Sequence, residues 1–300
     1  MKKIIYFTTL FLVASTFNCL ISCNKKSDDA PSPSNPNNNN EISSVPASFT
    51  QKVLIEQFTG AWNGGCPDGI YRMDQLVSTG NSKVIGVNIH MGDAMETTQF
   101  NSFISIFNNN NLPQFPSAMV NRIPSLGNVI LTKTQWASNA NLDLAKIASC
   151  GLAIKSTISG TTATVEVHAG FKSAIPGTYN LTVYLVESKV TGTGSTYDQV
   201  NSNTSNDPNS PYYNKPTPIT GFEHNNVIRK VASADLGDVI DPSKVVAGGE
   251  FVKTYAIDIT GKTAGNLKIV ALINKPGTSP TTHEIMNIQS GELNSVKNWD

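Results

Sequence analysis

The residues of this chain that could do chemistry lie in a short turn that ends at Cys66. An apolar run, Val53–Phe58, leads through Thr-Gly into Trp62-Asn63-Gly64-Gly65-Cys66-Pro67, which opens a predicted helix. Disulfide exchange at such a turn uses two cysteines: one attacks as a thiolate, and the second resolves the mixed disulfide. Asn63 stands where the attacking cysteine would stand, and an amide cannot attack sulfur. The sequence therefore predicts a strand, turn and helix arranged as in a dithiol site but unable to carry out disulfide exchange.

This turn resembles the active-site turn of thioredoxin-like proteins, and a second segment supports the resemblance. Gln114–Asn121 places a proline directly before a short apolar strand, as in the cis-proline loop that faces the redox turn in those folds. The resemblance implies a cis peptide bond before Pro116, which is the minority isomer of X-Pro bonds. The alternative is that Cys66 is an ordinary buried cysteine in the core of some other α/β fold.

The N-terminus predicts export and lipid attachment. Lys2 and Lys3 precede an apolar stretch, 4–17, which has the charge and length of a secretory signal and is too short to span a bilayer comfortably. Leu20-Ile21-Ser22-Cys23 then resembles the lipobox of bacterial lipoproteins, which implies a signal peptide over 1–22 and fatty acyl chains such as palmitate on Cys23. A plain cleaved signal peptide is the alternative.

The segment 23–48 reads as a disordered tether, because it is rich in Ser, Pro and Asn and has almost nothing to bury. Within it, Lys25-Lys26-Ser27-Asp28-Asp29 resembles the charged signal that sends some Bacteroidetes lipoproteins to the outer face of the outer membrane. Any solvated tether also carries a few charges, so exposure at the cell surface and a periplasmic position both stay open.

Composition excludes some partners. Lysine plus arginine and aspartate plus glutamate balance at 22 each, and charged residues make up 15% of the chain, where about 25% is usual. No basic patch with interleaved aromatics is present, so we expect no nucleic-acid partner. We also expect no cofactor. Beyond the lipobox the only cysteines are Cys66 and Cys150, which we predict to be unpaired thiols.

The hydrophobic pattern predicts an α/β domain over 49–150. Strand and helix patterns alternate there in thioredoxin-like order. Asp93-x-x-Glu96 resembles a capping box that opens a helix. The apolar face of that helix is formed by Phe100, Phe103, Ile104 and Phe107. A last helix is predicted over about 134–149, with its inward side chains at Trp136, Ala140, Leu144 and Ile147.

From 151 to 300 the pattern changes to two-residue alternation between turns, which predicts an all-β domain, an immunoglobulin-like β-sandwich. The expected strands are Leu152–Ile158, Ala163–Ala169, Tyr179–Glu187, Val227–Ala232, Phe251–Ile257, Leu267–Ile273 and His283–Gln289.

Two sets of residues are candidates for binding. His90 and Asp93 follow a central strand, at the carboxyl end where α/β folds gather their sites. With Cys66 they could form a polar cluster or a metal site, but the scattered histidines lack zinc-ligand spacing, and we expect no metal. The second set, Tyr197, Tyr212 and Tyr213, lies on the long polar segment Thr191–Asn226. That segment is either a contact surface or an insertion without a role.

Taken together, the chain resembles the Bacteroidetes outer-membrane protein twenty-eight family of lipoproteins. The resemblance rests on the segments Leu54–Trp62, Gly64 with Cys66-Pro67, Ile89–Met95, Phe115–Arg122 and Glu223–Arg229. It implies the architecture and the location, a lipid-anchored outer-membrane lipoprotein, and no particular biochemical activity. For the activity we expect a binding or structural protein, with a protein or a glycan as ligand. An envelope thiol-disulfide oxidoreductase using Cys66 is the alternative, and the missing attacking cysteine favours the first.

Overall fold

The computed structural model describes residues 41–202 and 207–300, and in these residues the protein is mostly β-structure with a few helices. The elements before residue 150 are β1 (Val53–Thr59), α1 (Cys66–Thr79), β2 (Val84–His90), α2 (Gln99–Asn108), β3 (Ser117–Val120), β4 (Leu131–Thr132) and α3 (Trp136–Leu144). Those that follow are β5 (Cys150–Ser159), β6 (Thr162–Phe171), β7 (Asn180–Glu187), β8 (Val227–Val231), β9 (Asp238–Val239), η1 (Pro242–Lys244), β10 (Glu250–Asp258), η2 (Ala264–Asn266), β11 (Leu267–Asn274), β12 (Ile285–Glu292) and β13 (Val296–Lys297). The expected signal peptide, Cys23 and most of the expected tether lie outside the described residues.

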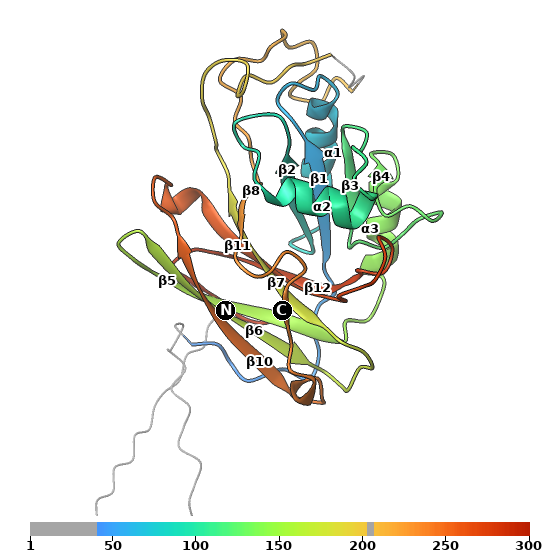
Figure 1. The fold of residues 1–300 in the computed structure, drawn as a ribbon, viewed down its shortest axis with the longest axis vertical. Helices are drawn as coiled ribbons and strands as arrows, with labels where there is room; N and C mark the ends of the chain where they lie inside the picture. Colours follow the sequence, from blue (N-terminus) through green and yellow to red (C-terminus); the bar gives the residue numbers. More distant parts are fainter. Residues whose placement is uncertain (1–40, 203–206) are drawn as a thin grey trace, which may run out of the picture. The chain divides into compact units, whose positions relative to one another are not determined.

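The strands form two sheets (Figure 1). The larger has the order β12-β11-β7-β8-β2-β1-β3-β4, with β9 paired to β7; the smaller has the order β10-β6-β5-β13. The seven strands expected after residue 150 correspond to β5, β6, β7, β8, β10, β11 and β12. Strands from both sides of Cys150 share the larger sheet, since β8 joins β2 through the pair Asn88–Val227. The division into domains at residue 150 stays a prediction.

The arrangement of β1, β2 and β3 sets the position of the site. β1 and β2 are parallel and in register from Val53–Val84 to Thr59–His90, whereas β3 is antiparallel to β1. The carboxyl ends of β1 and β2 therefore meet at one edge of the sheet. The turn that leads to Cys66 and the segment after His90 both begin at this edge.

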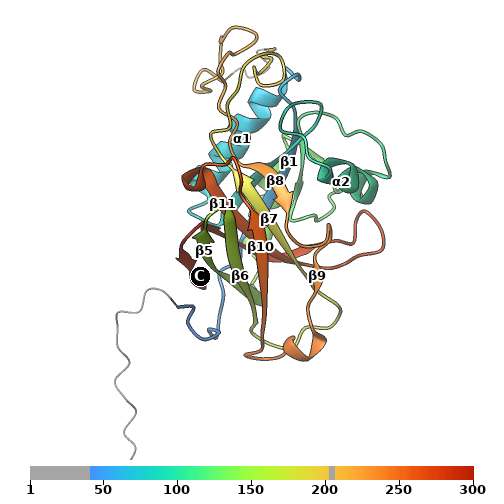
Figure 2. The ribbon, with the colours of Figure 1, turned by 60° about the vertical axis from the view of Figure 1, so that its left-hand side comes forward.

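Alternate residues of β1 face opposite layers, as the two-residue period of a strand requires. Val53 and Ile55 pack against side chains of α1 and α3, including Met73 and Trp136. Leu54 and Phe58 pack on the other face, against α2. Figure 2 shows α1 and α2 on opposite sides of β1. The inward residues of α2 are the four predicted from its sequence: Phe100, Phe103, Ile104 and Phe107.

β7 is buried on both faces because it belongs to two cores. Leu181, Val183 and Leu185 pack between the two sheets, with side chains of β5, β6, β10 and β11. Tyr184 and Val186 face the other way, into the core under α2. This strand reads as a nearly continuous apolar run because neither of its faces meets solvent.

Two details of the expected helices are wrong. α2 begins at Gln99, so Asp93 does not open it as a capping residue; the Asp93 carboxylate is instead engaged by His90 and by backbone N–H groups. α3 ends at Leu144, and the chain then turns into β5, with the Lys146 N–H donating to the Asp143 carbonyl at 3.0 Å. Ile147, expected inside, is consequently 85% exposed.

Candidate functional site

The turn between β1 and α1 places Asn63 against Cys66. Cys66 is the first residue of α1 and is fully buried. Its thiol donates to the Asn63 side-chain oxygen, with Sγ and Oδ1 3.5 Å apart, and the same oxygen accepts from the Gly65 N–H at 2.9 Å. Asn63 thus satisfies a free N–H at the start of the helix and occupies the space in front of the thiol.

The environment of Cys66 keeps its thiol protonated. Burial raises its pKa to about 11. Cys150 is also buried, and both cysteines are free. A thiol with this pKa is almost wholly uncharged near neutral pH, and the thiolate is the nucleophilic form.

Trp62 and Pro116 border the turn on the side of the loop that precedes β3. The Phe115–Pro116 peptide bond is cis, the isomer that the resemblance implied. Trp62 is 43% exposed, donates its Nε1–H to the Met91 carbonyl at 2.6 Å, and meets the Phe115 ring edge-on. α1 approaches Pro116 so closely that a Cβ added to Gly69 would lie 2.6 Å from the Pro116 Cβ, so this position requires glycine.

Part of the long segment Thr191–Asn226 folds over the turn, and we call residues 197–202 the strap. The Gln199 side chain is fully buried; its Nε2 donates to the carbonyl oxygens of Ala61 at 3.1 Å and Asn63 at 3.0 Å. The Val200 and Ser202 N–H groups donate to the turn carbonyls of Ala61 and Gly64, at 2.7 and 2.9 Å. In Figures 1 and 2 the segment lies over the end of the molecule at which α1 begins. The strap therefore holds and covers one side of the turn.

The structure brings His90 and Asp93 into contact, and both side chains lie inside the protein. The His90 Nδ1 is 2.7 Å from the Asp93 Oδ2, and that oxygen also accepts from the Ala61 N–H at 2.8 Å. Burial acts to raise the pKa of Asp93, but the hydrogen bond and charge of His90 and two backbone N–H groups outweigh it, so the pKa lies below its usual value. Asp93 thereby ties the segment after β2 to the turn before Cys66.

His224 connects this pair to the strap. Its ring meets the His90 ring edge-on, with centroids 5.2 Å apart, and its Nε2 lies 2.8 Å from the Tyr197 carbonyl oxygen. Burial lowers the pKa of His224 to about 4, so the ring is neutral and Nε2 carries the proton that the carbonyl accepts. Within the described residues no group of three or more His, Cys, Asp or Glu side chains could hold a metal ion.

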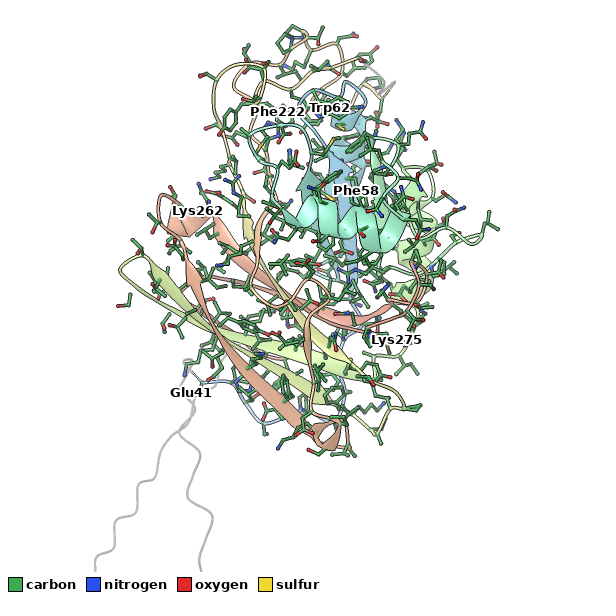
Figure 3. All side chains as sticks on the ribbon, in the orientation of Figure 1. Glu41, Phe58, Trp62, Phe222, Lys262 and Lys275 are labelled. Atoms are coloured by element: carbon green, nitrogen blue, oxygen red, sulfur yellow. The ribbon has the colours of Figure 1, made fainter. Side chains whose placement is uncertain are left out.

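The three candidate tyrosines lie in different environments. Tyr197 packs on the buried cluster of Ala61, Met95 and Val227, and Tyr212 packs on Phe222, with ring centroids 5.3 Å apart. Burial raises the pKa of Tyr212 to about 12. Tyr213 is 40% exposed. Figure 3 shows Phe222 at the end of the molecule that also carries Trp62. Two of these rings therefore hold the long segment in place, and one faces solvent.

Comparison with known proteins identifies the family. The family described as outer membrane protein Omp28 matches residues 101–297, which is more than half of the chain. The chain belongs to the Omp28 family. This is the family that the sequence resembled, and membership indicates the outer membrane as the location. Among the described residues, no helix is long and apolar enough to cross a membrane. No curated protein matches the chain.

Two solved structures resemble the Omp28 fold described here. HBP35 of Porphyromonas gingivalis has a TM-score of 0.63 at 19% sequence identity, over 84% of this chain and 78% of that one. Protein AGR_C_4864 from Agrobacterium tumefaciens has a TM-score of 0.50 at 11% identity, over 82% of this chain and 95% of that one. At these identities the likeness concerns the fold alone.

Sequence reasoning missed one buried charged cluster of this Omp28 protein. The Arg122 guanidinium donates through Nε and Nη2 to the two oxygens of Glu56, each at 2.8 Å, and Nη2 also donates to the Tyr184 hydroxyl at 2.6 Å. Glu56 and Arg122 are fully buried, and the guanidinium lies 4.8 Å from the centre of the Phe107 ring. The available signal was a lone glutamate inside the apolar run of β1, because a buried charge requires a partner.

Proposed function

We propose that this protein is a lipid-anchored outer-membrane lipoprotein that binds a ligand and does not carry out dithiol exchange. One observation carries the proposal: Asn63 stands in the attacking position with its side-chain oxygen committed to the Gly65 N–H and the Cys66 thiol. The buried, protonated Cys66 and the strap across the turn argue against the alternative, an oxidoreductase that uses Cys66 alone.

We assign the first half of the chain to a thioredoxin-like unit and the second to an immunoglobulin-like β-sandwich. The strand order β2-β1-β3-β4, with β1 and β2 parallel and β3 antiparallel to β1, supports the first assignment. α1 and α3 on one face of these strands and α2 on the other support it further. The core between β5, β6, β10 and β7, β11 supports the second assignment.

The wild-type protein should show no insulin reduction above background in a precipitation assay with dithiothreitol. Cys66 should react slowly with iodoacetamide at pH 7, and its rate should rise about tenfold per pH unit toward pH 11, because only the thiolate reacts. Cys66→Ser, assayed in parallel, should behave as the wild type does with insulin. Fast insulin reduction by the wild type that is lost in Cys66→Ser would contradict the proposed binding function and support the oxidoreductase alternative.

Lipid attachment at Cys23 predicts a clear change in fractionation. The wild type should partition with the outer membrane and into detergent, because several acyl chains at about 0.8 kcal/mol per buried CH₂ give lasting anchorage. Cys23→Ala should lose membrane attachment and accumulate as soluble or unprocessed protein, whereas Cys66→Ala should stay anchored. Mass spectrometry should find an acylated Cys23 at the mature N-terminus; a free N-terminus elsewhere would refute the assignment.

We also propose that the protein is exposed at the cell surface, and the charged segment 25–29 supports this location. Protease added to intact cells should shorten a surface-displayed protein.

A further inference from the structure

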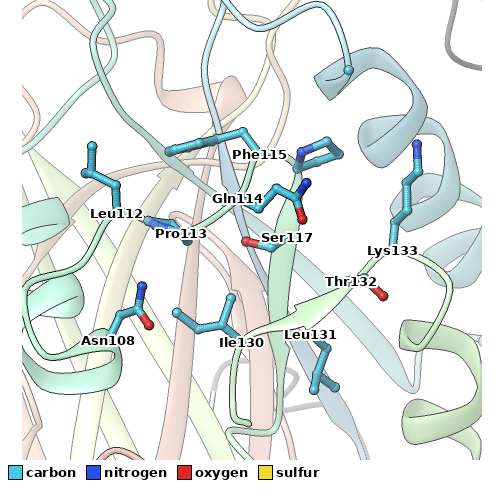
Figure 4. Close-up of a pocket in the computed structure, with 12 residues that line it drawn as sticks. Asn108, Leu112, Pro113, Gln114, Phe115, Ser117, Ile130, Leu131, Thr132 and Lys133 are labelled. Carbon is cyan, nitrogen blue, oxygen red and sulfur yellow. The ribbon is translucent and has the colours of Figure 1, made fainter.

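A cavity of about 440 Å³ opens beside the turn, between the loop before β3, the end of α2 and β4. Its size lies within the range of about 300–1,000 Å³ found for small-ligand sites. Figure 4 shows its labelled side chains arranged around an open space, with Phe115 on one side, Asn108 and Ile130 opposite, and Gln114 and Ser117 between them. We call this cavity the groove. A second cavity, of about 330 Å³, shares Asn108 and Ile130 with it and lies next to it.

One polar group in this groove lacks a partner. Ser117 is 4% exposed and lines the cavity, and its Oγ makes no hydrogen bond with any described residue. Leaving a buried hydroxyl unpaired is unfavourable, and a ligand that bonds to it would remove that cost. The Gln114 side chain at the same cavity is exposed and likewise has no hydrogen bond to the described residues.

The lining is almost uncharged. Its polar side chains are amides and hydroxyls, and the single ionic group, Lys133, is held at 2.5 Å by the buried Asp68 carboxylate. A strongly charged ligand would find no free opposite charge here. Amides and hydroxyls both donate and accept, which suits a ligand rich in hydroxyl groups. The Phe115 ring adds an apolar wall with a negative face, against which C–H groups can pack.

An added polypeptide strand fits this groove less well. Strand pairing needs N–H and C=O groups at regular intervals along the loop, and Pro113 and Pro116 have no N–H to offer. Recognition must therefore come mainly from side chains.

We propose that the groove lined by Phe115, Ser117, Gln114 and Asn108 binds a neutral oligosaccharide. This deepens the binding role proposed above and rests on it. The Ser117 Oγ and the Gln114 amide would bond to sugar hydroxyls, while one sugar face packs on Phe115.

The test is calorimetry and saturation-transfer NMR of the full mature protein with maltohexaose, cellohexaose, mannohexaose and xylohexaose. At least one should bind at millimolar concentration or below. Ser117→Val should weaken that binding about fivefold to tenfold, as the loss of one hydrogen bond does, and Phe115→Ala should weaken it further. Thr157→Val, which removes an exposed hydroxyl at a separate cavity of the smaller sheet, should leave it unchanged.

The thermal stability of Ser117→Val shows whether that variant folds correctly. Ser117→Val removes an unpaired buried hydroxyl from a strand, so its thermal stability should equal or exceed that of the wild type. The proposal is overturned if none of the four sugars binds at millimolar concentration, or if Ser117→Val and Phe115→Ala leave binding unchanged. It is also overturned if reduced, carboxymethylated lactalbumin binds the groove and the sugars do not. None of these results bears on the insulin assay, so the two proposals can fail separately.

Discussion

Replacing Arg122 by methionine is expected to lower the free energy of unfolding by about 3–5 kcal/mol. The guanidinium and the Glu56 carboxylate are both fully buried and share two hydrogen bonds of 2.8 Å. Burial acts to lower the pKa of Arg122, but the Glu56 charge outweighs it and raises that pKa. Arg122→Met would leave Glu56 with the Tyr184 hydroxyl, 2.9 Å away, and no opposite charge. Urea unfolding followed by circular dichroism measures the loss.

The matched control is Lys155→Met, which removes a lysine from an ion pair with the 66% exposed Glu41 carboxylate. Such surface pairs contribute about 0–1 kcal/mol. Combining Arg122→Met with Glu56→Leu should recover much of the loss, since an apolar replacement of both charges removes the uncompensated carboxylate. A single Arg122→Met variant as stable as the Lys155→Met control would show that the buried pair does not hold these strands together.

Local patterns predicted the elements well, because burial repeats with the period of each element. The apolar spacing of Phe100, Phe103, Ile104 and Phe107 identified the inward face of α2. Two-residue alternation identified the main strands after residue 150. The start of α2 was missed because Asp93 reads as a cap in sequence, whereas its carboxylate is occupied by His90 and by the Ala61 N–H. Ile147 was wrongly expected inside because the apolar spacing continues beyond Leu144, where α3 ends.

The candidate site was only partly predictable, since its decisive contacts join distant segments. Sequence reasoning found Asn63, Cys66 and Pro116, because all three belong to the segments that resemble thioredoxin-like proteins. It could not find that Gln199 bonds to the carbonyls around Asn63, across more than 130 positions, because nothing local distinguishes that glutamine. It also could not join His224 to His90, because a ring contact leaves no spacing in the sequence.

The Asn63→Cys variant is expected to form a disulfide with Cys66 under oxidising conditions and to acquire insulin-reducing activity. The substitution restores a Cys-x-x-Cys spacing at the start of α1, where the N-terminal helix dipole stabilises a thiolate. The variant should lose about 1 kcal/mol of stability when reduced, because the bond from the Gly65 N–H to Asn63 is lost. Mass spectrometry of alkylated peptides measures the disulfide, and the precipitation assay measures the activity.

Two further variants separate thiol chemistry from access. Asn63→Ser also removes the amide but adds no thiol, so it should stay inactive. Gln199→Ala in the Asn63→Cys background removes the side chain that ties the strap to the Ala61 and Asn63 carbonyls, and it should raise activity by exposing the new thiol. If Asn63→Cys stays fully reduced under oxidation, with or without Gln199→Ala, the turn does not have the geometry of a dithiol site. The thioredoxin-like assignment of the first half would then fail.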